Sequence, residues 1–295
     1  MGLHKVADTR SALFWYPGSN PADRKRIQPE SLLHYCRNIY SQRGDDGIAA
    51  EIFKRLNITD GFFVEFGGWD GVYLSNCRAL FEAGWSGAFI EADAKKFQDL
   101  KNNYREAERV ICINEWVGLP GTRGKTMDQI ASEHFPGRPI DYMSIDIDGL
   151  DYRILETMAL RPKVICIEGG FAFNPLFTRR IPDEIARKNL GQSLPVMMDV
   201  GRAAGYTPVC FNQNVFLVLD ELAGPFNKIV KQPLTLWRDA WFNESDQFRA
   251  GMRRFRARSS NVRAVEGNGL FYLPWERPSI LRRMWRRLRW RDLRG

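Results

Sequence analysis

Short apolar segments that alternate with amphipathic ones constrain the fold of this chain most strongly. The apolar segments span residues 61–67, 87–93, 109–118, 141–148 and 163–170. The helical stretches between them read "LSNCRALFEAG", "AKKFQDLKNNY", "KTMDQIASEHF" and "LDYRILETM", and "DDGIAAEIFKRL" precedes the first strand. Strands that are apolar throughout and alternate with helices are typical of a parallel sheet covered on both faces. The sequence therefore predicts an α/β fold with a mostly parallel sheet.

The chain divides into three parts around this pattern. Residues 45–222 form the α/β domain, which ends in "LPVMMDVGRAAGYTPVCFNQNVFLVLDEL", a predicted helix with a stop at Gly205 and two strands that pair around "NQN". Residues 1–44 are an N-terminal helical appendage, with a helix expected over 29–40, and residues 223–295 are a basic C-terminal extension. A chain of 295 residues, 44% of them hydrophobic, is long enough to bury a sizeable core.

Charge and cysteine usage exclude several classes of protein. From Arg249 onward there are fourteen arginines and three acids, so the net charge of +8 belongs to the tail and the rest of the chain is net negative. No stretch approaches the roughly 20 apolar residues of a membrane span, and the N-terminus lacks the apolar core of a secretory signal. We therefore expect a cytoplasmic protein. Its five cysteines are widely spaced and odd in number, which indicates neither a disulfide framework nor a zinc site.

Acidic and amide side chains follow each of the five predicted parallel strands. Ligands of open α/β sheets bind beyond the carboxyl ends of the strands. A single acid at such a position often marks only the point where a strand meets water, but five strands that end alike indicate a binding edge. The residues are Glu65, Glu91, Asp93, Asn114, Glu115, Asp146, Asp148 and Glu168.

The stretch "FFVEFGGWDG" at 62–71 joins one of these acids to three glycines. Gly67, Gly68 and Gly71 let the backbone turn sharply beside a ligand, and the helix expected to begin in "LSNCRAL" offers N–H groups to an anion. Glu65 can meet a cationic group, and Glu91 is placed to bind a ribose diol. S-adenosylmethionine combines these three features. A dinucleotide needs the G-x-G-x-x-G spacing, which is missing here.

Several blocks of the sequence resemble FkbM-like S-adenosylmethionine-dependent methyltransferases. These blocks are "YSQRGDDGIAAEIF", "FFVEFGGWDGVYLSNCRALFEAGWSGAFIEAD", "DYMSIDIDGLDYRILETM", "RPKVICIE" and "GQSLPVMMDVGRAAGYTPVCFNQNVFLV". The resemblance implies a seven-stranded Rossmann-like sheet with helices on both faces that ends in an antiparallel hairpin, and methyl transfer to oxygen, often on sugars. Trp69 and "NEWVG" at 114–118 are bulkier than the family pattern. The cofactor-binding residues indicated by the blocks and the strand ends are Gln42, Glu65, Gly67, Gly68, Gly71, Ser75, Asn76, Glu91, Ala92, Asn114, Glu115 and Asp146.

Carboxylates are the strongest catalytic candidates, since none of the three histidines (His4, His34 and His134) is well placed. Asp146 and Asp148 leave one strand on the same face and Glu168 leaves its neighbour, so these three can act as the base or as ligands of Mg²⁺. In the alternative interpretation, Asp148 and Asp151 cap the following helix and Gly149 turns the chain.

The loop after the fifth strand, "GGFAFNPLF", offers candidate contacts to the acceptor. Phe171, Phe173 and Asn174 suit a sugar face, although the two rings can equally serve loop packing. The acceptor expected from the resemblance is a saccharide, a polysaccharide, a glycolipid or a glycosylated natural product.

The basic tail contains "SILRRMWRRLRW" at 279–290, an amphipathic helix with arginines around an apolar stripe. Through residues 279–293 it can lie on an anionic membrane surface at the inner face of the membrane, pack on the body or a second subunit, or bind nucleic acid, which we favour least. The favoured function is a sugar O-methyltransferase. A non-catalytic Rossmann-like binding module and an RNA methyltransferase are the alternatives, and a homo-oligomer stays possible.

Overall fold

The computed structural model contains one seven-stranded sheet, and it describes residues 21–147, 149–170, 173, 175–187, 191–246 and 249–250. The strand order is β3-β2-β1-β4-β5-β7-β6. The strands are β1 (Phe62–Phe66), β2 (Ser86–Ile90), β3 (Val110–Ile113), β4 (Tyr142–Ile145), β5 (Val164–Glu168), β6 (Tyr206–Asn212) and β7 (Asn214–Leu219). This is the Rossmann-like fold class that the sequence predicts.

The first five strands, β1 through β5, pair in parallel with their neighbours in the sheet. The hairpin of β6 and β7 adds two antiparallel strands beside β5. Gln213 alone connects β6 to β7, with a φ of 66°. Because β7 runs antiparallel to β5, the start of β7 lies at the carboxyl edge of the sheet, where Asn214 pairs with Glu168. The predicted strands around "NQN" are confirmed.

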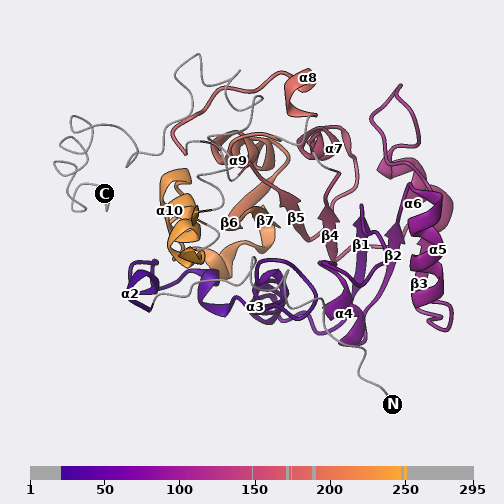
Figure 1. Ribbon diagram of the computed structural model, residues 1–295, viewed down its shortest axis with the longest axis horizontal. Coiled ribbons are helices and arrows are strands. Elements are labelled where there is room, and N and C mark those ends of the chain that lie inside the picture. Colours follow the sequence, from indigo (N-terminus) through magenta and orange to yellow (C-terminus); the bar gives the residue numbers. More distant parts are fainter. Residues whose placement is uncertain are drawn as a thin grey trace.

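Helices cover both faces of the sheet (Figure 1). The helices α7 (Asp151–Thr157) and α9 (Leu194–Ala203) lie on one side, α3 (Asp45–Leu56) and α4 (Arg78–Glu82) on the other, and α5 (Ala94–Asn103) and α6 (Met127–His134) lie at the β3 end. The shorter elements and the last helix are α2 (Pro21–Arg24), η1 (Leu32–Tyr35), α8 (Asp183–Ala186), η2 (Asp220–Leu222), η3 (Gly224–Phe226) and α10 (Pro233–Asn243). None of the helices in the described ranges has the length and apolar character needed to cross a membrane.

The core lies between the sheet and its helices. All five residues of β1 are buried, as are all four of β4. Ring contacts join the layers: Phe53 of α3 packs edge-on against Tyr142 of β4, with centroids 5.6 Å apart, and tilted against Trp85 at 4.6 Å. Strands buried on both faces explain why their sequences are apolar runs and not alternating patterns.

The prediction of a helix over 29–40 is wrong, because only the short 3₁₀ helix η1 forms there. Ser31 begins η1 by accepting a hydrogen bond from the backbone N–H of Leu33. Beyond η1, the N–H groups of residues 39–41 donate to the side chain of Asp46. Because these N–H groups are bound by a side chain, they are not available for hydrogen bonds to the preceding turn of a helix, and residues 39–41 form a loop.

The N-terminal appendage and the first part of the C-terminal extension pack together beside β6. Gln28 bonds to the backbone of Val230 and, through its own N–H, to the carboxylate of Asp239. Arg249 forms an ion pair with Asp23 at 3.0 Å. Figure 1 shows α10 above α2 at this end of the molecule. The predicted tail helix at 279–290 lies outside the described residues.

Candidate functional site

A cavity of about 810 Å³ opens at the carboxyl ends of β1, β2 and β4. Ten of the twelve predicted cofactor-binding residues line it, and the two exceptions are Gly71 and Asn114. The ten are Gln42, Glu65, Gly67, Gly68, Ser75, Asn76, Glu91, Ala92, Glu115 and Asp146. Cavities of this size suit a drug-sized or cofactor-sized ligand.

The glycines after β1 have different roles. Gly67 has a φ of 76°, and a Cβ atom there would lie 1.9 Å from the backbone oxygen of Asp146. Only glycine therefore lets the ends of β1 and β4 approach each other. Gly71 also has a positive φ, but a Cβ there would meet the rings and methyls of Tyr104 and Leu100. Gly71 is thus needed for packing against α5, and it lies outside the cavity wall.

Glu65 is buried in the cavity wall and organises the segment before α4. Its carboxylate accepts hydrogen bonds from the Ser75 hydroxyl at 2.6 Å and from the N–H groups of Asn76 at 2.8 Å and Cys77 at 3.2 Å. Glu65 thus binds the two N–H groups directly before α4, and the N–H of Arg78, the first residue of the helix, donates to the Ser75 hydroxyl at 3.0 Å. These three N–H groups already have protein acceptors, so the ligand anion predicted at the start of this helix finds no support from them.

Burial raises the pKa of Glu65 to about 7, although the hydrogen bonds from Ser75, Asn76 and Cys77 favour the charged form. A carboxylate in this state gains from a cationic group placed beside it, because the added positive charge offsets the cost of desolvation. The site therefore fits an ammonium group in the cavity.

Glu91 shapes the loop after β1 and keeps capacity for a ligand. One carboxylate oxygen accepts the N–H of Trp69 at 3.0 Å and the other accepts the N–H of Asp93 at 2.7 Å. A carboxylate offers about four acceptor positions, so two remain for hydroxyl groups. This capacity, on a residue that lines the cavity, fits the predicted ribose diol.

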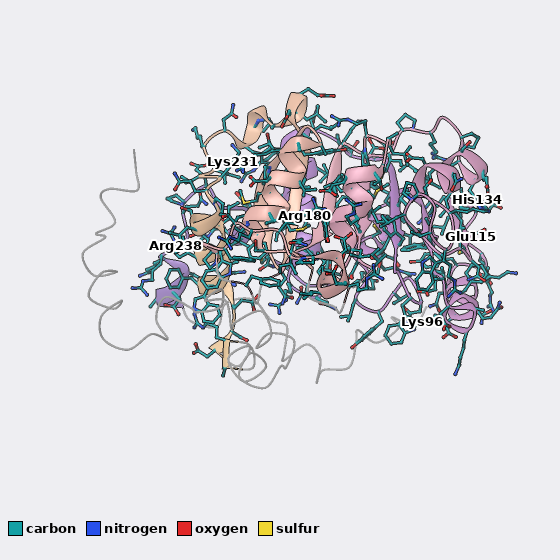
Figure 2. All side chains as sticks on the ribbon, turned by 90° about the horizontal axis from the view of Figure 1, so that it is seen from above. Lys96, Glu115, His134, Arg180, Lys231 and Arg238 are labelled. Carbon is teal, nitrogen blue, oxygen red and sulfur yellow. The ribbon has the colours of Figure 1, made fainter. Side chains whose placement is uncertain are left out.

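Asn114 lies outside the cavity lining and binds a residue that belongs to it. Its amide donates to the backbone oxygen of Glu91 at 2.7 Å, which ties the ends of β2 and β3 together. Glu115 lines the cavity and forms an ion pair with Lys125 at 2.7 Å. In Figure 2, Lys96 and Glu115 lie at the end of the molecule opposite to Arg238.

Two exposed tryptophans at the rim of the cavity were not predicted as site residues. Trp69 is 44% exposed and Trp116 is 48% exposed, and both line the cavity. The Nζ atom of Lys96 lies 4.9 Å from the ring centre of Trp69, and the Cζ atom of Arg123 lies 4.8 Å from the ring centre of Trp116. Their bulk, already visible in the sequence, was the available signal. Exposed indoles beside a cavity offer stacking surfaces for a planar ring.

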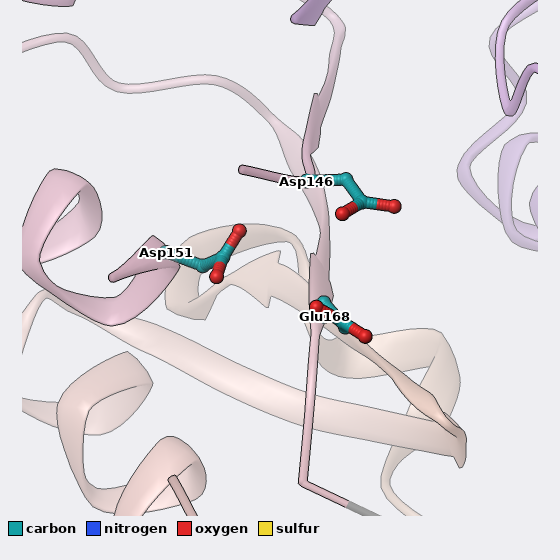
Figure 3. Close-up of side chains that lie close together, drawn as sticks. All are labelled: Asp146, Asp151 and Glu168. Atoms are coloured by element: carbon teal, nitrogen blue, oxygen red, sulfur yellow. The ribbon is translucent and has the colours of Figure 1, made fainter. Parts of the chain in front are cut away.

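Three carboxylates gather at the ends of β4 and β5 (Figure 3). Oxygens of Asp146, Asp151 and Glu168 all lie within 4.8 Å of one another. Asp148, the third predicted member, lies outside the described residues, and Asp151 takes part in its stead. Both oxygens of Asp151 accept backbone N–H groups, from Ile147 at 2.7 Å and Gly149 at 2.8 Å. Asp151 is the first residue of α7, and its carboxylate binds N–H groups of the preceding loop and not of the helix, so the helix capping predicted for it is not what it does. Asp151 thus folds the loop, which leaves Asp146 and Glu168 as the better candidates for chemistry.

The predicted acceptor contacts are only partly described. Phe171 and Asn174 lie outside the described residues. Phe173 is 1% exposed and stacks on Phe177 with a centroid distance of 6.4 Å, which is the loop-packing arrangement. His34 bonds to the backbone oxygen of Gln28 and His134 is exposed, so neither lines the cavity.

Solved methyltransferase structures are similar to part of this chain. A protein assigned as a caffeoyl-CoA O-methyltransferase of Staphylococcus aureus is 13% identical over 66% of this chain and 90% of its own, with a TM-score of 0.42. A SAM-dependent methyltransferase from Aquifex aeolicus is 11% identical over 68% of this chain and 98% of its own, with a TM-score of 0.36. An O-methyltransferase family protein from Burkholderia thailandensis is 11% identical over 59% and 57%, with a TM-score of 0.37.

No family model matches the sequence, and the comparison with curated proteins finds no match. At the identities and TM-scores given above, the fold class of this chain rests on its own strand order. The resemblance to FkbM-like enzymes stays an interpretation of the sequence blocks.

Proposed function

We propose that this chain is an S-adenosylmethionine-dependent O-methyltransferase of the FkbM-like kind, with a sugar hydroxyl as its acceptor. The observation that carries the proposal is the cavity at the carboxyl ends of β1, β2 and β4, because Glu65, Glu91 and the glycine turn at Gly67 all line it. An acid suited to an ammonium, an acid suited to a diol and a close backbone turn occur together there. The saccharide acceptor rests on the sequence resemblance.

The residues of this chain divide the work as follows. When bound, S-adenosylmethionine supplies a methyl group on a positively charged sulfur. Glu91 holds hydroxyl groups and Glu65 offsets a positive charge. Alignment of an acceptor oxygen with the methyl carbon by the cavity walls removes much of the entropic barrier.

Methyl transfer to a hydroxyl also releases one proton. As the oxygen forms its bond to the methyl carbon, the carbon–sulfur bond breaks and the hydroxyl proton must be taken up by a base. Asp146 lines the cavity and Glu168 lies close to it, so we assign the base to this pair. Mg²⁺ held by Asp146 and Glu168, with Asp148 as the predicted third ligand, would lower the pKa of the acceptor hydroxyl.

Calorimetry with S-adenosylmethionine tests the proposal directly. We expect binding by the full chain, and a loss of about tenfold or more in affinity for Glu91→Ala, since hydrogen bonds to a charged group are lost. The matched control is Asp93→Ala, which removes a carboxylate from the same strand end that caps α5 and lies outside the cavity wall. An absence of binding at millimolar ligand would favour the non-catalytic module.

Mass spectrometry of polysaccharide and glycolipid from cells with and without the protein identifies the acceptor through one missing CH₂ increment.

Asp146→Asn is expected to bind the donor and to lose transfer. Transfer that persists after exhaustive chelation and gains nothing from added Mg²⁺ would rule out the metal. Methylation of RNA in place of a saccharide would establish the RNA alternative.

A further inference from the structure

The loop 38–44, which precedes α3, contributes one residue to the lining of the cavity. That residue is Gln42, which lines the cavity together with residues at the ends of β1, β2 and β4. The loop has no helix or strand of its own. Its shape must therefore be set by the groups that bind its backbone.

Two side chains, Asp46 at the start of α3 and Asn38 within the loop, bind the loop backbone at Gln42 and on both sides of it. One oxygen of Asp46 accepts the N–H groups of Ile39 and Tyr40, both at 2.7 Å, and of Ser41 at 3.0 Å. The amide of Asn38 donates to the backbone oxygen of Gln42 at 2.8 Å, and its oxygen accepts the N–H of Gly44. The loop is thus held as a fixed turn on the end of α3.

Arg43 anchors the same loop to distant parts of the chain. Its guanidinium forms an ion pair with Glu244, which follows α10, and the side chains of both residues are 2% exposed. The amide of Asn212, the last residue of β6, donates to the backbone oxygen of Arg43. The residue that follows Gln42 is therefore fixed at its side chain by the C-terminal extension and at its carbonyl by the sheet.

The physical cost of this ion pair points to a role in geometry. Desolvation of two charges offsets most of their attraction, so a buried ion pair adds little net stability compared with apolar residues of the same volume. Burial accordingly raises the pKa of Glu244 and lowers that of Arg43, while their mutual attraction opposes both shifts. In some proteins a buried ion pair instead fixes one arrangement of the two segments that it joins.

We propose that Glu244 is a positioning residue for the cavity: through Arg43 it holds the loop 38–44 and so presents Gln42 to the donor. The C-terminal extension thereby takes part in the binding site without contacting it. The part of this inference that concerns the donor rests on the proposed function. The part that concerns the order of the loop rests on the geometry alone.

Hydrogen–deuterium exchange of the full chain, read peptide by peptide, tests the order of the loop. We expect Glu244→Ala to speed exchange of the amides in 38–44 by about tenfold, since a hydrogen bond to a charged group is lost, and to leave β1 unchanged. Should Glu244→Ala fail to fold, the double variant Arg43→Met with Glu244→Met keeps the packed volume without the ion pair. It is expected to show the same faster exchange in the loop.

The matched control is Asp23→Ala, because the Asp23–Arg249 pair also joins the N-terminal appendage to the C-terminal extension and neither residue belongs to the loop. This control should leave exchange in 38–44 unchanged. Unchanged exchange in Glu244→Ala and in the double variant would overturn the proposal. An equal rise in β1, which would indicate general destabilisation, would overturn it as well.

Donor affinity separates positioning through Gln42 from other effects. Glu244→Ala is expected to weaken S-adenosylmethionine binding about tenfold in the wild-type background and to have no further effect in the Gln42→Ala background, since coupled residues are not additive. Equal weakening of donor binding in both backgrounds would show that Glu244 does not act on the donor through Gln42. A wild-type chain that binds no donor would refute the proposed function, and the exchange comparison would still decide whether Glu244 orders the loop.

Discussion

At the scale of single residues, Glu65 both holds the segment directly before α4 and lines the cavity. Its carboxylate is held by three protein donors, and yet burial raises its pKa to about 7. Below that pH the group carries a proton and cannot attract a cation. Above it the carboxylate is charged, and a bound ammonium would lower the raised pKa by favouring the charged form.

We therefore predict that the affinity for S-adenosylmethionine rises with pH through about 7, because binding of the cation is linked to loss of the Glu65 proton. Glu65→Gln should bind more weakly and with little dependence on pH in this window. Calorimetry at a series of pH values measures both effects. If Glu65→Gln kept the wild-type pH dependence, the titrating group would be another one.

Gly67 is the residue whose replacement should disturb the site most directly. A Cβ at this position would lie 1.9 Å from the Asp146 backbone oxygen, and the φ of 76° is strained for any other residue. Gly67→Ala should cost several kcal/mol of unfolding free energy, whereas Gly84→Ala should cost only about 1–2 kcal/mol. Gly84 is the control because it has a φ of 99° and no atom within 4 Å of the position that a Cβ would take. Equal losses in urea unfolding would show that the clash is relieved by a small shift.

At the scale of elements, the sequence predicts those whose determinants are local. The helix α3 spans Asp45–Leu56, the predicted segment, because an apolar stripe and two acids in the first turn coincide there. The ten-residue helix α9 ends before Gly205, which has a φ of 81°. The five parallel strands and the hairpin around Gln213 also follow from the pattern. The expected helix at 29–40 fails at its end, where Asp46, a residue outside the segment, binds the N–H groups of Ile39 and Tyr40.

The candidate site likewise has features that the sequence predicts and features that depend on the folded loops. Position at a strand end brought Glu65, Glu91 and Asp146 to one cavity, since parallel strands share an edge. Sequence order could not show that Asn114 turns back onto the Glu91 backbone. It also could not show which donors each carboxylate accepts, because those depend on loop conformation.

The loop between β3 and α6 presents Trp116 to the cavity. Backbone hydrogen bonds between Trp116 and Lys125 and between Gly118 and Lys125 hold its two sides together. Gly124 is required there, because a Cβ would lie 2.1 Å from the Trp116 backbone oxygen. The element therefore fixes an exposed indole at the cavity rim.

We predict that Trp116→Ala weakens S-adenosylmethionine binding by about tenfold, the loss expected when a base no longer stacks on an aromatic ring. Trp116→Phe should retain most of the affinity, since a ring remains. Calorimetry on both variants provides the measurement. Unchanged affinity in Trp116→Ala would place the planar part of the ligand away from this loop.

At the scale of the whole molecule, the described parts of the N-terminal appendage and of the C-terminal extension pack together on the β6 side of the sheet. Trp237 and Trp241 of α10 stack with centroids 5.5 Å apart, and both are buried. Arg43 and Glu244 pair across 201 positions in sequence. Contacts between such distant segments leave no periodic signal, which is why the sequence divides the chain into a domain with two appendages while the structure packs the two described appendages together.

The basic tail gives the last prediction, and it concerns residues outside the described part of the chain. Fourteen arginines lie from Arg249 onward, against a net negative remainder. An amphipathic helix at 279–290 with Trp285 in its apolar stripe would bind anionic lipid through both charge and buried apolar area. We predict that the full chain sediments with anionic vesicles, less so at high salt, and that a chain lacking 279–295 does not. Neutral vesicles are the control for charge. Equal sedimentation of both chains with anionic vesicles would leave the tail to pack on the body or on a second subunit, and the lipid-borne saccharide would lose its support from the tail.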